Sequence, residues 1–316
     1  MSTQVERWQT SRISLSFAQT KEIQMPHNYR LGCPVWACPD WVGALFSTKD
    51  RKKWLGEYSS VFGTVEGNST FYGLPAMDTV RRWAESSGDE FRFCLKFPKA
   101  ISHDRRLIDA EVETGLFLDI LTVLADADRL GPSFLQLSPT FSAVEMDRLT
   151  SYLQTLPTEF PYAVEVRHPD FFDQGATEKA LDEMLRELKI DRVLFDSRPL
   201  FSKPPSDEAE EASQAKKPRS PHRTTVTGSR PMLRLVGRNS VDDTLPWIEE
   251  WAVVIADWIN AGLTPYVFAH SPDEKFAPEF AARLHAELQS HLSSLPDLAA
   301  WPGLAKETGP KQLSLF

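Results

Sequence analysis

Eight short apolar runs alternate with amphipathic segments along the chain, and this alternation predicts an α/β fold with a single (β/α)₈ TIM barrel. With 316 residues, the chain is long enough for one such barrel with further segments at its ends. Alternation sustained over this length favours one barrel over two smaller domains. The predicted strands span residues 30–36, 63–68, 91–97, 133–138, 162–167, 192–196, 232–236 and 265–270.

The predicted strands are short and apolar, as expected for parallel strands that are buried on both faces. The second strand begins with the β-branched pair Thr64 and Val65, after a helix-like stretch that runs from Arg51 to near Gly63. The later connections repeat apolar residues at three-and-four spacing, which is typical of helices with one buried face. These segments span residues 80–84, 116–124, 146–156, 181–188, 248–259 and 280–288.

The alternation breaks once, where residues 202–230 form a long insertion after the sixth strand. An acidic run at residues 207–211 is followed by a basic run without acidic residues. Such a composition buries little apolar surface, so we expect the insertion to lack order of its own. It is either a tolerated disordered insertion, or a mobile lid or phosphate-contacting arm on the barrel face that carries sites. The basic run holds Lys216, Lys217, Arg219, Arg223 and Arg230.

The rest of the chain divides into a barrel and two ends. Residues 1–28 mix charged and amide side chains and are expected to form a flexible extension. The barrel is expected to span residues 29–300. Residues 301–316 have no hydrophobic periodicity and are expected to form a flexible tail.

The bulk composition restricts the class of protein. The net charge of −9 excludes nucleic-acid coating by overall charge, so any such contact needs a local basic patch. An odd cysteine count (Cys33, Cys38 and Cys94) without metal-type spacing predicts reduced thiols and a cytoplasmic location. No apolar stretch is long enough to span a membrane.

Polar side chains concentrate at the carboxyl ends of the predicted strands, where closed α/β barrels keep their chemistry. Their cations favour an anionic ligand, most simply a phosphate or a carboxylate. Alternatively, the cations and nearby acids form a salt-bridge network that neutralises itself. The residues expected to bind a ligand at this mouth are Trp36, Asn68, Thr70, Lys96, Arg167, His168, Arg234, Arg238 and His270.

Three acidic residues at strand ends, Glu66, Glu165 and Asp196, are candidate catalytic groups. Glu66 and Glu165 could act as the acid/base pair of a glycoside hydrolase. Alternatively, all three could hold a divalent metal together with His168 and His270. The sequence does not identify the metal.

The last five residues form an unusual end to the tail, because large apolar side chains follow a glutamine. Exposed apolar clusters often mark a segment that is bound by a partner. The residues expected to bind one are Gln312, Leu313, Leu315 and Phe316. The alternative is that the apolar side chains fold back and close the bottom of the barrel.

The body of the chain resembles the YecE-like family of TIM barrels, also called domain of unknown function 72. The resemblance rests on residues 32–43 (GCPVWACPDWVG), the sequence VEGNSTFY at 65–72 and VEVRHP at 164–169. Residues 80–84, 91–98, 101–103, 136–139 and 234–238 also match, so it covers about residues 31–288. It implies the fold and the face that carries the site, and it implies no reaction.

The tail resembles the sliding-clamp-binding peptide of bacterial replication and repair proteins, whose pattern is Gln-Leu-(Ser/Asp)-Leu-Phe. The resemblance implies that Gln312 bonds at the rim of the clamp pocket and that Leu313 packs nearby. Leu315 and Phe316 would then fill the apolar cleft. A tethered peptide of this kind would bring the barrel to DNA.

These observations combine into one leading hypothesis and two alternatives. The leading hypothesis is a barrel that binds a phosphate-bearing or nucleic-acid ligand, is recruited to DNA by its tail, and hydrolyses a phosphodiester or nucleotide if it is an enzyme. Glu66, Glu165 and Asp196 would then serve as base or metal ligands. The alternatives are a non-catalytic adaptor tethered to the clamp and a carbohydrate-active hydrolase.

Overall fold

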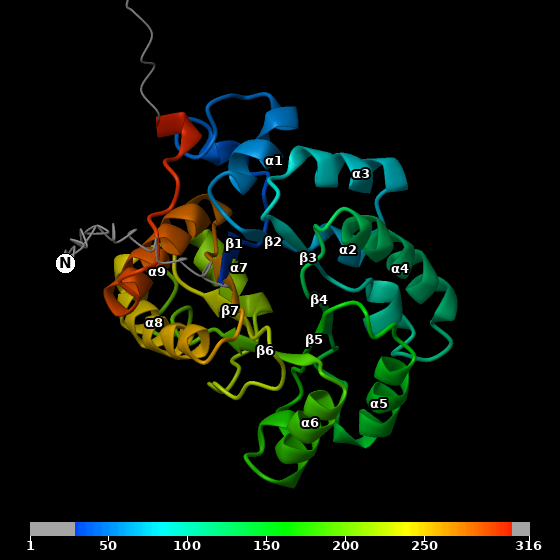
Figure 1. Ribbon diagram of the computed structural model, residues 1–316. Helices are drawn as coiled ribbons and strands as arrows, with labels where there is room; N and C mark the ends of the chain where they lie inside the picture. Colours follow the sequence, from blue (N-terminus) through cyan, green and yellow to red (C-terminus); the bar gives the residue numbers. More distant parts are fainter. Residues whose placement is uncertain (1–28, 305–316) are drawn as a thin grey trace, which may run out of the picture.

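A computed structural model of the chain describes residues 29–304, and it confirms the predicted (β/α)₈ barrel (Figure 1). Eight parallel strands follow the order β3-β2-β1-β8-β7-β6-β5-β4. Bridges from Phe93 to Leu130 and from Lys96 to Phe134 bring β3 next to β4 and nearly close the ring. The strands are β1 (Arg30–Cys33), β2 (Thr64–Gly67), β3 (Arg92–Leu95), β4 (Ser133–Gln136), β5 (Tyr162–Glu165), β6 (Asp191–Asp196), β7 (Met232–Val236) and β8 (Tyr266–His270).

Helices cover the outside of the barrel, and each predicted amphipathic segment lies in one of them to within two residues. Helix α4, for example, buries Phe117, Ile120, Leu121 and Leu124 along one stripe. The main helices are α1 (Arg51–Ser59), α3 (Met77–Ser86), α4 (Glu111–Asp126), α5 (Met146–Gln154), α6 (Ala176–Glu187), α8 (Leu245–Asn260) and α9 (Ala277–His291). Across residues 29–304, none of the helices has the length and hydropathy that a membrane span requires.

Short helical turns lie in the loops. Two of them, α2 (Ser69–Tyr72) and the π-helix η2 (Ala100–Asp104), follow the carboxyl ends of β2 and β3. The 3₁₀ turns are η1 (Pro39–Trp41), η3 (Ala143–Glu145), η4 (Pro169–Phe172), η5 (Asp242–Thr244), η6 (Glu274–Phe276) and η7 (Pro302–Leu304). The predicted extension 1–28 and the peptide 312–316 lie outside the described residues.

Alternate residues of the strands fill the barrel interior. A buried apolar cluster, separate from the one that packs beneath the helices, consists of Cys94, Phe134, Ala163, Val193, Met232, Tyr266 and Phe268. Because side chains on a strand alternate between faces, the residues two positions further along also point inward. These are Lys96, Gln136, Glu165, Phe195, Arg234 and His270. The interior therefore changes from apolar to polar towards the carboxyl ends of the strands.

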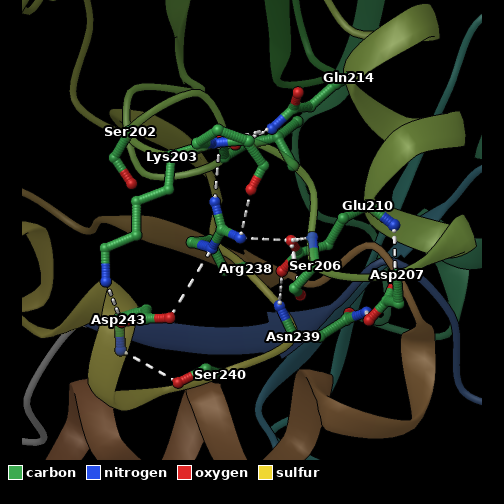
Figure 2. Close-up of polar contacts among 12 residues, drawn as sticks. Ser202, Lys203, Ser206, Asp207, Glu210, Gln214, Arg238, Asn239, Ser240 and Asp243 are labelled. Carbon is green, nitrogen blue, oxygen red and sulfur yellow. Dashed lines mark hydrogen bonds and ion pairs between the residues drawn. The ribbon is translucent and has the colours of Figure 1, made fainter.

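The insertion at residues 202–230 differs from the expected disorder, because it contains helix α7 (Glu208–Lys216) and buried side chains. Figure 2 shows its main anchor, the fully buried Glu210 paired with Arg238. Arg238 also donates hydrogen bonds to the carbonyls of Lys203 and Pro204, both at 3.0 Å. The composition argument failed here because polar and main-chain contacts hold the segment in place of apolar burial.

Candidate functional site

Two buried glutamates from opposite parts of the barrel share one guanidinium at the carboxyl ends of the strands. Glu66 of β2 accepts from Arg234 Nη2 at 2.6 Å and from Nε at 2.8 Å. Glu165 of β5 accepts from Nη1 of the same arginine. His270 Nε2 lies 2.9 Å from Glu66 Oε2, and Asn68 donates to Oε1 at 2.7 Å. Arg234 therefore binds both carboxylates and fixes their positions.

The electrostatics of this group keep both glutamates ionised. Burial opposes ionisation of Glu66, but Arg234 and His270 hold its pKa well below the usual range. Burial is likewise outweighed at Glu165, where Arg234 and Arg167 lower the pKa to about 2. Burial lowers the pKa of His270 to about 4, so its imidazole is neutral at physiological pH. Neither carboxylate carries a proton that it could donate near neutral pH.

A second group of polar side chains lies beside the glutamates, on the β3–β5 side of the barrel. Lys96 Nζ and Arg167 Nη2 both donate to Gln136 Oε1, at 2.9 Å and 2.7 Å. Arg167 Nε also donates to Glu165 at 2.7 Å. Burial, followed by the like charge of Arg234, lowers the pKa of Lys96 to about 7. An ammonium group is therefore held here at an electrostatic cost.

The insertion adds one more cation to the mouth of the barrel. Lys217, at the end of α7, places its Nζ 5.9 Å from the centre of the Phe195 ring, and the Arg167 guanidinium lies 5.6 Å from the same ring. Burial, followed by the like charge of Arg234, lowers the pKa of Lys217 to about 8. Lys217 thus belongs to the mouth although it is distant from Arg234 in the sequence.

We refer to Glu66, Glu165, Arg234, Lys96, Arg167 and Lys217 as the mouth cluster. With both lysines protonated, its four cations face two carboxylates. Glu274 of η6 also acts on Lys217, and burial raises the pKa of that carboxyl. Cations still outnumber carboxylates when Glu274 is included. In that protonation state the cluster therefore has a surplus of positive charge in a largely buried setting, a pattern that is typical of anion sites.

Comparison with known proteins places the chain in a family. The family model described as Protein of unknown function DUF72 matches residues 30–303. The chain belongs to the DUF72 family. UPF0759 protein YecE of Escherichia coli K12 is 37% identical over 286 residues, covering 90% of this chain and 99% of YecE. YecE of Escherichia coli O157:H7 gives the same identity and coverage.

Solved structures of other DUF72 proteins share the fold. A crystal structure of a DUF72 protein from Enterococcus faecalis V583 aligns with a TM-score of 0.63 at 18% identity, covering 90% of this chain and 99% of that chain. One from Thermotoga maritima MSB8 gives a TM-score of 0.61 at 20% identity, covering 84% and 99%. At these identities the likeness concerns the barrel itself and assigns no activity.

Seven of the sequence-derived site residues meet at the mouth of this DUF72 barrel, and Asp196 does not. The residues that meet are Glu66, Asn68, Lys96, Glu165, Arg167, Arg234 and His270. Asp196 accepts a hydrogen bond from the indole of Trp251 in α8 at 2.8 Å and pairs with Arg198. Phe195 points inward, so its neighbour Asp196 must point outward. The expected catalytic role of Asp196 lacks the geometry that it needs.

Four expected ligand-binding residues also have other contacts. Arg238 anchors the insertion, and the buried hydroxyl of Thr70 donates to the carbonyls of Gly67 and Lys96. Trp36 packs edge-on against Trp83 of α3 and against Phe93, outside the barrel interior. His168 accepts from the N–H of Asp170 and caps η4. Each of these contacts has a structural purpose of its own.

The proposed metal site is not formed by these residues. Within the described part of the chain, no three histidine, cysteine, aspartate or glutamate side chains converge on a point that could hold a metal ion. His270 is bound to Glu66, whereas Asp196 and His168 lie elsewhere. The three cysteines of the described chain are free and buried. The residues described here thus do not gather around a common metal position.

Sequence reasoning missed two members of the mouth, Lys217 and Phe195. Phe195 could have been found by the alternation that places Val193 inward. Lys217 was recognised only as part of a basic run, because the fold of the insertion selects it over its neighbour Lys216. No periodic signal in the sequence distinguishes these two lysines.

Proposed function

We propose that this DUF72 protein binds a phosphate-bearing ligand at the mouth cluster. The observation that carries the proposal is the surplus of buried cations around the Glu66–Arg234–Glu165 bridge, with lysine pKa values lowered by burial and like charge. A bound anion would relieve the repulsion that lowers these pKa values. Arg167 and Lys217, which both approach Phe195, are the phosphate ligands that the geometry favours.

Aromatic rings beside the cations extend the proposal to nucleotides or nucleic acid. Lys96 Nζ lies 3.9 Å from the centre of the half-exposed Phe71 ring, and Phe195 contacts three cations. Bases and sugar rings stack on such side chains. A ligand with a phosphate and a planar ring would therefore use both features of the mouth.

The same geometry supports binding over hydrolysis by the two glutamates. A glycoside hydrolase needs one carboxylic acid with a raised pKa, whereas Arg234 keeps both Glu66 and Glu165 ionised. A phosphodiester hydrolase needs a free base or a metal, and Arg234 occupies both carboxylates. The carbohydrate alternative is thus the less favoured, and a non-catalytic binding protein fits the contacts.

Titration calorimetry with inorganic phosphate tests the binding proposal. We expect Lys217→Met to weaken phosphate binding by about tenfold, because it removes one charge-assisted contact. Lys216→Met is the matched control, since Lys216 is the exposed neighbour of Lys217. Equal affinities of the two variants and the parent chain, or no binding by any of them, would reject the proposal.

Recruitment to a DNA polymerase sliding clamp is a second proposal, which the sequence Gln-Leu-Ser-Leu-Phe at residues 312–316 alone supports. Its test is retention of purified bacterial clamp on the immobilised full chain and on a chain that lacks residues 312–316. We expect the deletion to abolish retention, because the peptide supplies the apolar contacts. Equal retention would end this proposal and leave phosphate binding unaffected.

A further inference from the structure

A buried amine without a carboxylate partner lies at the mouth, directly after the carboxyl end of β3. Lys96 is 8% exposed, and its Nζ donates to the amide oxygen of Gln136 and lies over the Phe71 ring. In residues 29–304, no ion pair within 4.0 Å joins this lysine to a carboxylate. A buried lysine that serves only the fold would be expected to pair with an acid.

The charged groups that face Lys96 come from four neighbouring elements. Arg234 of β7 and Arg167, which follows β5, disfavour the ammonium form, while Glu165 and Glu66 favour it less strongly than burial opposes it. The balance leaves a large fraction of Lys96 neutral near pH 7. A neutral amine has the lone pair that an ammonium lacks, and desolvated lysines beside other cations are activated nucleophiles.

The loop after β3 adds an imidazole and an unusual backbone. His103 lies in the π-helix η2, packs edge-on against Phe71 at 5.1 Å, and has its pKa lowered to about 4 by burial and then by Lys96. Arg106, Leu107 and Asp109, which follow, have φ of 50°, 64° and 49°. π-Turns and non-glycine residues in the left-handed region occur preferentially at functional sites. Of this loop, His103 reaches the Phe71 ring that Lys96 also contacts.

We propose that Lys96 is an amine nucleophile that condenses with the aldehyde or ketone of a phosphate-bearing ligand to form a Schiff base. The Nζ lone pair forms a bond to the carbonyl carbon, and the carbonyl π pair moves to oxygen. One proton passes from nitrogen to that oxygen, which gives a carbinolamine. Loss of water then forms the C=N bond, so no oxidant or reductant is needed.

The neighbours of Lys96 have defined parts in this reaction. Gln136 orients Nζ, and the neutral His103, whose Nδ1 lies 2.8 Å from Ser102 Oγ, packs against the Phe71 ring that Lys96 also contacts. Arg167, which shares the acceptor Gln136 Oε1 with Lys96, and Lys217 lie beside Phe195 and would hold the phosphate next to the amine. The inference thus rests on the proposed phosphate site and adds the carbonyl class of the ligand.

Reductive trapping of the full chain tests this inference. Pyridoxal 5′-phosphate supplies an aldehyde and a phosphate, pyridoxal supplies the aldehyde alone, and borohydride fixes any imine for peptide mass spectrometry. We expect pyridoxal 5′-phosphate to label Lys96 about tenfold faster than Lys99, an exposed lysine of the same segment paired with Asp104. Labelling of Lys96 by pyridoxal, which brings no phosphate to raise the pKa of the amine, should already reach half of its maximum near pH 7. Lys96→Arg, which keeps the charge, should abolish the fast phase.

Competition by inorganic phosphate separates this inference from the function on which it rests. Protection of Lys96 by phosphate, with slower labelling by pyridoxal, supports both. Binding of phosphate with Lys96 labelled no faster than Lys99 rejects the Schiff base and keeps the phosphate site. Fast labelling of Lys96 by both aldehydes without phosphate protection keeps the nucleophile and rejects the phosphate site. Slow labelling without phosphate binding rejects both.

Discussion

Two buried clusters of charge lie on either side of strand β6, and they differ in their balance. Outside the barrel, Arg192 donates to Glu178 at 3.0 Å and to Asp182 at 2.8 Å, and Arg223 from the insertion donates to Glu178 at 2.6 Å. Remaining guanidinium hydrogens reach the carbonyls of Phe171 and Phe172. Two cations thus face two carboxylates, and main-chain acceptors complete the outer cluster.

The mouth cluster inside the barrel does not reach the same balance. Its cations outnumber the carboxylates, and Lys96 and Lys217 both have lowered pKa values because burial and like charges disfavour their ammonium forms. The outer cluster joins α6, β6 and the insertion and needs no ligand to complete it. Buried charges that balance one another need only the fold, whereas an uncompensated surplus of one sign is the pattern expected of a binding site.

The largest expected effect comes from removing the central arginine of each cluster. Arg234→Leu and Arg192→Leu should each lower the free energy of unfolding by about 3–5 kcal/mol, because each leaves buried carboxylates without their main partner. Only Arg234→Leu should also weaken phosphate binding. Chemical denaturation and calorimetry on the same preparations measure both effects.

Arg192→Leu is thus the matched control for Arg234→Leu. The comparison breaks down if both variants lose phosphate affinity to the same extent, since the outer cluster would then belong to the site. It also breaks down if Arg234→Leu binds phosphate as well as the parent chain does.

A smaller effect is expected at the anchor that holds the insertion over the barrel. Glu210 accepts from Arg238, from the N–H and hydroxyl of Ser206, and from the N–H of Asn239. Glu210→Gln replaces one carboxylate oxygen by an NH₂ group that faces these hydrogen-bond donors. It should lower the free energy of unfolding by about 1–3 kcal/mol. The exposed neighbour Glu211→Gln should change stability by less than about 0.5 kcal/mol.

The anchor variant also probes how Lys217 reaches the mouth. We expect Glu210→Gln to weaken phosphate binding by a few-fold, because a looser insertion positions Lys217 less well. Unchanged affinity together with lowered stability would show that the position of Lys217 does not depend on the anchor.

The smallest effect concerns the stability cost of the surplus charge. The folded-state pKa of Lys96, about 7, lies below its ordinary value of 10.5, so the unfolded chain binds more protons between these values. The stability of the parent chain should therefore rise with pH over this window. The destabilisation caused by the buried Lys96 ammonium reaches its full size below about pH 7. Lys96→Met should stabilise the fold by about 1–2 kcal/mol near pH 6.

That gain should shrink as the pH rises towards 10. The exposed Lys99→Met is the control and should show neither the gain nor its pH dependence. Thermal or chemical unfolding across the pH range measures both. A loss of stability in Lys96→Met near pH 6 would mean that the ammonium is favourably paired in the mouth.

The fold was predictable from the sequence because strand and helix periodicities repeat in strict alternation. The site was predictable only in part. Choosing the last residues of each strand found Glu66 and Glu165, but it also selected Asp196, whose outward orientation follows from the inward Phe195. Side chains alternate between the two faces of a strand, so counting in twos from the inward Val193 gives Phe195 as inward and Asp196 as outward.

The remaining errors came from contacts that no local pattern contains. The acidic and basic runs of the insertion were expected to be disordered, yet Glu210 and Arg223 find buried partners on distant elements. Lys217 reaches the mouth because it directly follows the last residue of α7. Arg238 anchors the insertion and does not face the mouth as a ligand-binding residue. Such pairings depend on tertiary structure and are not visible in composition.

Proton uptake on anion binding tests the central claim most directly, because it reports whether a surplus cation of the mouth titrates with its ligand. Sulfate is a suitable probe, since it is a dianion that does not titrate near pH 8.5. At that pH Lys217, whose pKa is about 8, is mostly neutral, and a bound dianion should raise the pKa and draw in roughly half a proton or more. Calorimetry in buffers of different ionisation enthalpy should show this uptake in the parent chain and in Lys216→Met. The uptake should be markedly smaller in Lys217→Met, where Lys96, whose lower pKa is about 7, remains to take up a proton. Sulfate binding without proton uptake, or equal uptake in Lys217→Met, would contradict the account.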